Sequence, residues 1–144
     1  LDARRCIAYL TIELHGPIPE ALRPAIGNRI YGCDDCQLVC PWNKFARAAA
    51  DPDFRVRHQL DAPRLSELLG WDADTFSQRM AGSAIHRIGH ARFLRNVAVA
   101  LGNGEPTPEA LRALHARRDD ADPLVAEHVR WAINRLEAQL ADCR

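Results

Sequence analysis

The stretch YGCDDCQLVCPWN, residues 31–43, carries three cysteines with the spacing C-x2-C-x3-C, and a proline follows the third at once. Thiolates this close together can turn inward around one loop and reach a common inorganic core. A tetrahedral zinc ion takes four ligands, and an iron–sulfur cubane also takes four, normally thiolates. The segment therefore predicts a metal centre that needs at least one ligand from elsewhere in the chain.

Cys6, which lies 27 residues before Cys33, is the candidate for that further ligand. The spacing C-x2-C-x3-C-P is the end of the ferredoxin run C-x2-C-x2-C-x3-C-P, in which the last cysteine binds the other of two clusters. On this pattern Cys6, Cys33 and Cys36 bind one [4Fe-4S] cluster and Cys40 reaches a second. The first cluster then lacks one ligand and the second lacks three. These four equal one complete C-x2-C-x2-C-x3-C-P run, so we expect that run upstream of Leu1 and interpret the chain as part of a longer protein.

Two simpler interpretations stay open at this point. A zinc ion bound by Cys6, Cys33, Cys36 and Cys40 needs no upstream ligand, and free cysteines are often inert core residues. Cys143 is far from the other four in sequence and is expected to have no role.

Composition narrows the class of protein. Five cysteines are an odd number and do not suit a secreted disulfide scaffold, so a reducing, cytoplasmic location is expected. No apolar run approaches the ~20 residues of a membrane span, and no membrane partner is expected. The formal net charge is zero, which argues neither for nor against nucleic acid. We expect a monomer.

The chain divides into two parts of different character. Residues 1–45 hold the cysteines, with a short helix or strand over residues 7–14 and a short helix from about Pro19. Residues 46–63 read as a connector, and residues 64–144 read as all-helical. The expected fold is mainly α: a partial ferredoxin-like iron–sulfur segment, then HEAT-like helical repeats forming an α-solenoid.

Helix signals are clear in the second part. Asp72, Thr107 and Asp122 are predicted N-caps, the last two followed by proline at N1. A helix over residues 91–101 follows a loop at residues 82–90 and ends with glycine capping at residues 102–104. Its predicted buried positions are Leu94, Val97, Ala98 and Leu101. Those of the last helix are Val125, Val129, Ile133, Leu136 and Leu140.

Residues 80–104 contain no Asp or Glu but carry several cations. Arg87, His90, Arg92 and Arg95 lie on the predicted loop and the first turns of the helix that follows. One interpretation is a surface that binds phosphates, which the backbone N–H groups at the start of a helix also favour. The alternative is a solvated basic face on a helical repeat, with Arg95 bracing the solenoid. Trp71 and Trp131 are predicted core residues, whereas His58, His115 and His128 are predicted to lie at the surface.

With LDARRCIAYLTIEL before it and FLRNVAVALGN after it, the segment YGCDDCQLVCPWNKFA resembles the C-terminal part of the epoxyqueuosine reductase family. The resemblance implies an enzyme that reduces epoxyqueuosine to queuosine at the wobble position of tRNA. It further implies two [4Fe-4S] clusters, a cobalamin held mainly by an N-terminal domain outside this sequence, and a HEAT-like domain that helps to hold tRNA. An electron donor is the other implied partner, and these residues alone would be inactive.

Carried over to this sequence, the resemblance makes Cys6, Cys33, Cys36 and Cys40 cluster ligands. Asp34 and Asp35 match a stretch that faces the cobalamin. The anticodon stem-loop is expected on Lys44 and Asn43 and on the acid-free segment, at Arg87, His90, Arg92 and Arg95. Trp42 is expected to shield a cluster from water. The alternatives are a stand-alone ferredoxin-type electron carrier and a zinc-binding interaction module.

Overall fold

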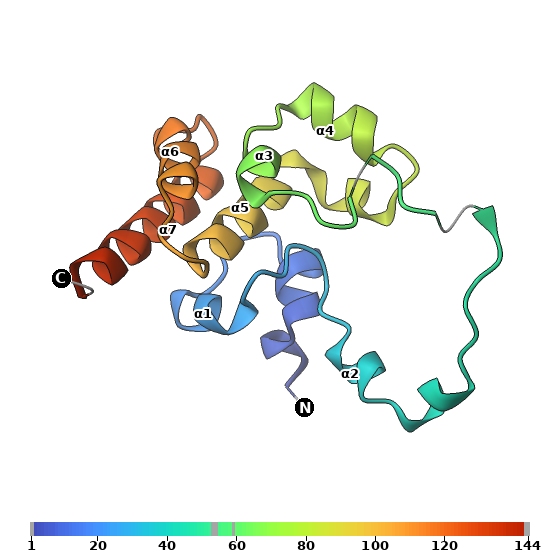
Figure 1. Cartoon of the computed structure of the whole chain (residues 1–144). Helices are drawn as coiled ribbons and strands as arrows, with labels where there is room; N and C mark the ends of the chain where they lie inside the picture. Colours follow the sequence, from blue (N-terminus) through green and yellow to red (C-terminus); the bar gives the residue numbers. More distant parts are fainter. Residues whose placement is uncertain (1, 53–54, 59, 143–144) are drawn as a thin grey trace.

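Helix α5, Gly89–Gly102, lies at the centre of the structure, because its last ten residues are all buried. A helix that is apolar almost all round must be covered on every side. The computed structural model describes residues 2–52, 55–58 and 60–142, and the regular structure in those ranges is helical (Figure 1). The prediction of a mainly α fold is confirmed. Cys143 lies outside the described residues.

Most of the other helices are short. The α-helices are α1 (Arg23–Ile26), α2 (Asp35–Leu38), α3 (Leu65–Leu69), α4 (Ala73–Met80), α6 (Pro108–Ala116) and α7 (Pro123–Asp142). The 3-10 helices are η1 (Ala3–Arg5), η3 (Glu20–Leu22), η4 (Pro41–Phe45) and η6 (Ala84–Ile88), and η2 (Tyr9–Glu13) is a π-helix. None of the helices in the described ranges is both long enough and apolar enough to cross a membrane.

The predicted N-caps are present. The Asp72 carboxylate accepts a hydrogen bond from the Thr75 N–H at 2.8 Å, and the Thr107 hydroxyl accepts one from the backbone of α6 at 3.2 Å. Asp122 accepts one from the Leu124 N–H at 2.8 Å at the start of α7. Each cap gives a partner to an N–H group that lacks one inside its helix.

The start and the end of α5 differ from the prediction. Residues 84–88, expected in a loop, form η6, and α5 begins at Gly89, two residues before the predicted start. Glycine capping at its end is wrong, because the C-cap is Asn103 in a right-handed conformation. Gly102 instead allows α5 to approach α7: a Cβ there would lie 2.8 Å from the Trp131 ring and 2.9 Å from Ala132.

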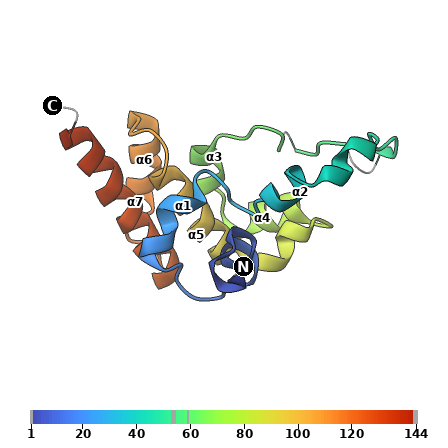
Figure 2. The same ribbon diagram turned by 90° about the horizontal axis from the view of Figure 1, so that it is seen from below.

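Helices α5 and α7 pack side by side and form the main core with α3, α4 and α6 (Figures 1 and 2). All four predicted core residues of α5 are buried, as are the first four of α7. Leu140 is only half-buried, so that prediction is wrong. Trp71 and Trp131 pack against the core as predicted. That these helices are HEAT-like repeats stays a prediction.

The segment before residue 32 packs on the same central helix. Residues 7–13 are helical, which settles the open choice between helix and strand. Leu10, Ile18 and Ile26 form a second apolar cluster with Val99 of α5. The N-terminal segment with Cys6 is therefore fixed to the helical part by apolar packing, although the predicted division into residues 1–45 and 64–144 stays a prediction.

His128 of α7 is fully buried, so its predicted surface position is wrong. Its Nε2 accepts a hydrogen bond from the Ile18 N–H at 3.1 Å. Nδ1 therefore carries the proton and donates to the Leu124 carbonyl at 2.7 Å. Burial lowers the pKa of His128 to about 4. The neutral ring thus connects α7 to the N-terminal segment.

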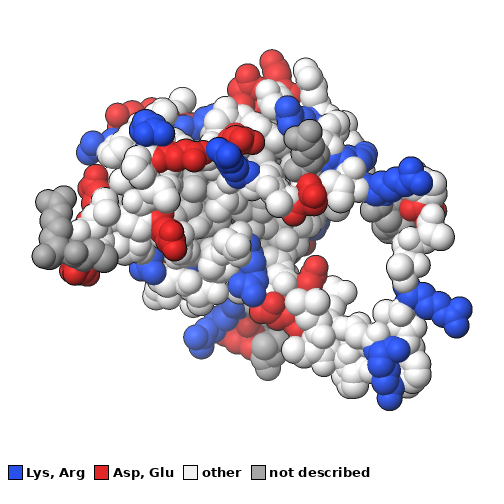
Figure 3. All heavy atoms as spheres, viewed as in Figure 1, with Lys and Arg blue, Asp and Glu red and all other residues white. Residues whose placement is uncertain are grey.

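Beyond α2 the chain leaves the body as an arm, which we define as residues 39–52, before it returns to α3 (Figures 1 and 2). Figure 3 shows open space between this part of the chain and the rest of the molecule. Leu38, next to the arm, and Val39, Trp42 and Phe45 on it expose 72%, 80%, 74% and 63% of their surface. These four side chains form what we call the arm apolar surface.

Replacing Gly102 by Ala is expected to destabilise the fold by about 1–3 kcal/mol, because the added methyl group forces α5 and α7 apart. Urea unfolding followed by circular dichroism measures the change. Gly16→Ala is the control, because a Cβ at Gly16 meets no atom within 4 Å. Equal stability of Gly102→Ala and the wild type would show that the helices do not approach this closely.

The buried neutral His128 predicts a loss of stability in acid. The pKa of His128 lies below its unfolded value of 6.5, so the unfolded chain binds more protons between pH 6.5 and 4. Stability contributed by this group is complete above pH 6.5 and decreases by about 3 kcal/mol as pH falls to 4. Urea unfolding at several pH values should give a shallower dependence for His128→Gln, and an identical slope would contradict the assignment.

Candidate metal centre

Cys6, Cys33 and Cys36 line one cavity of about 450 Å³. Asp34 and Asp35 line the same cavity. Cys40 is not among the lining residues. The structure therefore brings together the three cysteines that were predicted to share one cluster and leaves out the one that was assigned to the other.

Local backbone geometry places the three thiols. Cys6 ends η1, and its carbonyl accepts a hydrogen bond from the Leu10 N–H at 3.0 Å as the next helix begins. Gly32 and Asp34 both have positive φ, +70° and +59°, so the chain turns sharply on each side of Cys33. Glycine adopts this conformation freely, and aspartate tolerates it better than most residues. The turn leads into α2, which carries Cys36.

Cys40 lies beyond α2, where the chain changes direction. Its carbonyl accepts a hydrogen bond from the Asn43 N–H at 3.0 Å, and Pro41 opens η4. The fixed φ of Pro41 suits the first position of this short 3-10 helix. The Asn43 amide also donates to the Leu38 carbonyl at 3.2 Å. Cys40 is thus held at the base of the arm.

Charged residues from both segments line the cavity, Asp2 and Arg5 near Cys6 and Asp34 and Asp35 near Cys33. The Asp35 carboxylate contacts the Arg29 guanidinium at 3.0 Å. A hydrogen bond from the Cys33 thiol, with the Arg29 contact, lowers the pKa of Asp35. Across the described ranges, no three His, Cys, Asp or Glu side chains meet closely enough to hold a single metal ion. Cys6, Cys33, Cys36 and Cys40 are all free thiols.

A donor set of three thiols around one open cavity suits an iron–sulfur cluster, because soft thiolates are the normal ligands of such clusters. The fit is incomplete for Cys6, Cys33 and Cys36 alone, since a cubane takes four ligands. The fourth must come from outside this group.

Arg95 does not lie on an exposed basic face, and its predicted tRNA contact is wrong. The side chain is fully buried, and its guanidinium donates to the carbonyls of Leu10, Leu14 and Gly16 at 2.7–2.9 Å. Burial lowers the pKa of Arg95 to about 10, which still leaves it charged at neutral pH. The alternative that Arg95 braces the structure is the one that the contacts support.

The other predicted tRNA residues differ in accessibility. Arg92 is half-buried and donates to the carbonyls of Ile88 and Ile12 at 2.6 and 3.2 Å. His90 is half-buried, with a ring nitrogen 2.8 Å from the Trp71 carbonyl oxygen. Both side chains are thus largely engaged inside the protein.

Arg87 is exposed, and its guanidinium contacts the Glu13 carboxylate at 2.8 Å. The hydrogen bond from Arg87 lowers the pKa of Glu13. Lys44 on the arm is also exposed, with its ammonium 5.0 Å from the centre of the Phe45 ring. Of the predicted RNA-binding cations, these two are the accessible ones.

Sequence reasoning missed a group of cations along the arm and just after it. Arg47, Arg55 and Arg57 are exposed, as is Lys44. In Figure 3 Lys and Arg atoms lie along this extended part of the chain. The sequence indicates the basic character of this segment, because residues 44–57 contain four basic residues and two aspartates.

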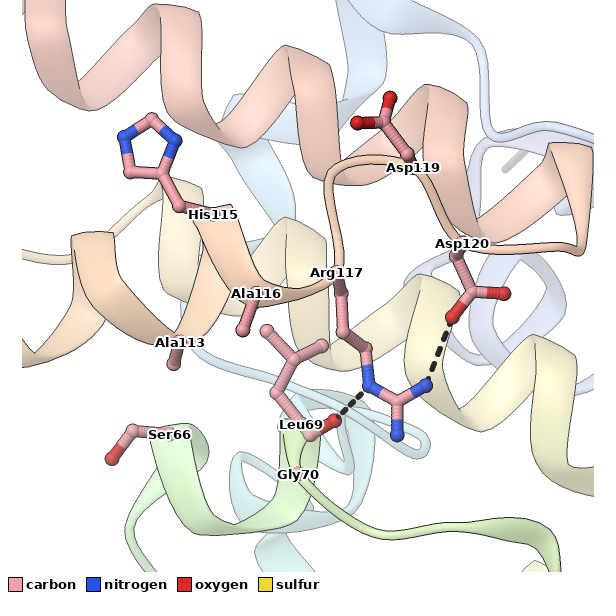
Figure 4. Close-up of a pocket in the computed structure, with 9 residues that line it drawn as sticks. All are labelled: Ser66, Leu69, Gly70, Ala113, His115, Ala116, Arg117, Asp119 and Asp120. Carbon is pink, nitrogen blue, oxygen red and sulfur yellow. Dashed lines mark hydrogen bonds and ion pairs between the residues drawn. The ribbon is translucent and has the colours of Figure 1, made fainter.

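Another pocket, of about 430 Å³, lies between α3 and the end of α6 (Figure 4). Arg117 donates to the Leu69 carbonyl at 2.5 Å and pairs with Asp120 at 2.9 Å. These polar groups satisfy one another across the contact between the two helices. None of the predicted site residues lines this pocket, so it is no part of the candidate centre.

Comparisons with known proteins agree with this centre. A family model described as a 4Fe-4S double cluster binding domain matches residues 1–43. The epoxyqueuosine reductase of Burkholderia pseudomallei is 61% identical, over 92% of this chain and 36% of its own length. That of Escherichia coli is 56% identical, over 92% of this chain and 35% of its own length.

The fold leads to the same proteins. A crystal structure of epoxyqueuosine reductase with an epoxyqueuosine-modified tRNA-Tyr stem loop matches with a TM-score of 0.85 and 32% identity. The match covers 94% of this chain and 36% of that one. By sequence and by fold, the chain is therefore a relative of one region of the epoxyqueuosine reductases and spans little more than a third of their length.

Proposed function

We propose that this chain is the C-terminal, iron–sulfur and tRNA-binding region of an epoxyqueuosine reductase, the enzyme that reduces epoxyqueuosine to queuosine at the tRNA wobble position. The observation that carries the proposal is the convergence of Cys6, Cys33 and Cys36 on one cavity. These cysteines all lie within the segment that matches the double-cluster family. The identity of 52–61% to curated relatives supports the reaction.

Cys6, Cys33 and Cys36 would hold one [4Fe-4S] cluster and Cys40 would be a ligand of the second. The remaining ligands would come from residues outside this sequence. When bound, the clusters supply electrons one at a time at low potential, which reductive opening of an epoxide requires. The thiolates of this chain would bind the clusters, and the turn at residues 32–34 orients those of Cys33 and Cys36. An electron donor has to supply the reducing equivalents.

The arm apolar surface supports the assignment to a larger protein. Four large exposed apolar side chains within eight residues, with the Trp42 and Phe45 rings in contact, are unusual, and exposed apolar patches mark interaction surfaces. They flank Cys40, the thiol that lacks partner cysteines here. The rest of the double-cluster segment would cover Trp42 and its neighbours, and Trp42 would then shield a cluster from water, as the sequence predicted.

Asp34 and Asp35 line the cavity beside the thiols, which supports their placement near a second cofactor. The resemblance names cobalamin, held mainly by an N-terminal domain beyond these residues. Asp35 already pairs with Arg29, so Asp34 is the freer of the two carboxylates to act there. With most of the cobalamin site elsewhere, this chain alone is proposed to be inactive.

The cluster assignment predicts distinct effects of single cysteine replacements in the longer gene product, purified without oxygen. Cys33→Ala is expected to remove about half of the iron and acid-labile sulfide, because one of two clusters loses a ligand. Cys40→Ala should remove the other half, with a different electron paramagnetic resonance spectrum remaining. Zinc without sulfide in the wild type would favour the interaction module. Clusters in a gene product with no cobalamin domain would favour the electron carrier.

The tRNA face is proposed to include Arg87 and the arm cations Lys44, Arg47, Arg55 and Arg57. Their accessibility and charge support contacts to phosphates of the anticodon stem-loop. A related enzyme has been crystallised with a tRNA stem loop, which supports RNA as the partner. Arg92 would act mainly by holding the backbone of Arg87, to whose carbonyl it donates at 3.2 Å, whereas His90 is engaged with the Trp71 carbonyl.

Replacing Arg87 by Ala in the longer protein is expected to weaken tRNA binding and to lower the slope of log Kd against log salt by about 1. Arg130→Ala is a matched control, because Arg130 is 54% exposed and pairs with Asp119, while Arg87 is 60% exposed and pairs with Glu13. Filter binding at several salt concentrations measures both. The same slope for Arg87→Ala and the control would remove Arg87 from the tRNA face.

A further inference from the structure

Three buried polar side chains connect α5 to the two segments that carry the cysteines of the cavity. Thr11, Arg95 and Asn96 are 0%, 0% and 1% exposed, and none of them lines the cavity. We propose that Thr11 and Asn96, supported by Arg95, are positioning residues that fix Cys6 relative to Cys33 and so stabilise the bound cluster. This inference rests on the proposed function, since it concerns the same centre.

The Thr11 hydroxyl makes the most direct link. It donates to the Ile7 carbonyl at 2.7 Å and accepts from the Gly32 N–H at 3.0 Å. Ile7 directly follows Cys6, and Gly32 directly precedes Cys33. One hydroxyl therefore joins the backbone next to each of the two ligands, although they lie 27 residues apart in sequence.

Asn96 makes a second link between the same segments. Its amide nitrogen donates to the Thr11 carbonyl at 2.7 Å and to the Ile30 carbonyl at 2.9 Å. Its amide oxygen accepts from Arg95 Nε at 3.0 Å. With these three bonds the amide group has one fixed orientation, because exchanging its oxygen and nitrogen would break all of them.

Arg95 holds the segment on the Cys6 side. Its guanidinium binds the carbonyls of Leu10, Leu14 and Gly16, which follow Cys6 along the chain. A buried cation needs hydrogen-bond partners throughout, so this set of carbonyls cannot shift without leaving the guanidinium unsatisfied. Helix α5 thus holds the segment after Cys6 through Arg95 and both segments through Asn96.

Outer hydrogen bonds of this kind orient the ligands of metal centres, and their loss weakens metal binding by roughly tenfold or more. The geometry predicts that removing the Thr11 hydroxyl loosens the cluster without removing a ligand. Cys6 and Cys33 would still be present but would lose their fixed separation. The effect should appear in the rate of cluster loss and in the spectrum of the reduced cluster.

The test uses the longer gene product, purified without oxygen and with its clusters. Thr11→Val removes the hydroxyl with little change in shape, and Thr11→Ser keeps it. The matched control is Asn103→Ala: Asn103 follows α5 and donates to the carbonyls of Arg23 and Gly27 at 2.8 and 3.1 Å, neither of which is next to a ligand cysteine in sequence. Iron release to a chelator, the electron paramagnetic resonance spectrum and the unfolding temperature are measured for each.

For Thr11→Val we expect iron release about tenfold faster than wild type, with an altered spectrum. Thr11→Ser should restore both, and Asn103→Ala should lower only the unfolding temperature. If Thr11→Val has wild-type iron release and a wild-type spectrum, the inference is overturned while the proposed function stands. If Thr11→Val does not fold, Asn96→Ser takes its place with the same expected result. A wild type without iron and sulfide would overturn the proposed function itself.

Discussion

The structure depends on one constraint: α5 is buried on all sides and still carries polar groups that must be satisfied. Arg95 and Asn96 meet this requirement by donating to backbone carbonyls of the N-terminal segment. The helix can therefore be buried only when that segment is in place. Further along the same helix, Gly102 lets α7 approach. The N-terminal segment with Cys6 is consequently an integral layer of the fold around α5.

Local signals accounted for much of what the sequence predicted. The caps at Asp72, Thr107 and Asp122 depend on a few neighbouring residues, and the apolar spacing of α5 depends on one helix alone. The pairing of Cys33 with Cys36 came from the close cysteine spacing of a ferredoxin pattern, which a short stretch of sequence shows. These features need no knowledge of distant contacts, which is why they could be predicted.

The failed predictions for Arg95 and His128 concern contacts between residues far apart in sequence. Arg95 looked like a surface cation because the carbonyls that it binds are about 80 residues away. A signal existed: Arg95 and Asn96 interrupt an otherwise apolar run, where polar residues are buried with partners. His128 gave a similar signal, because it lies beside the buried stripe of Val125 and Val129. The arm could not be predicted, since nothing local fixes its path.

The cysteines of the cavity come from two segments far apart in sequence, so a group that binds both would restrict the unfolded chain. A cluster held by Cys6 and Cys33, as proposed, would act as a cross-link and would close a loop that contains Leu10, Ile18 and Ile26, the apolar residues that pack on Val99. For a loop of 27 residues, chain entropy alone makes such a cross-link worth about 3–4 kcal/mol. Loss of such a cluster by oxidation would therefore lower the stability of the fold as well as remove a redox centre.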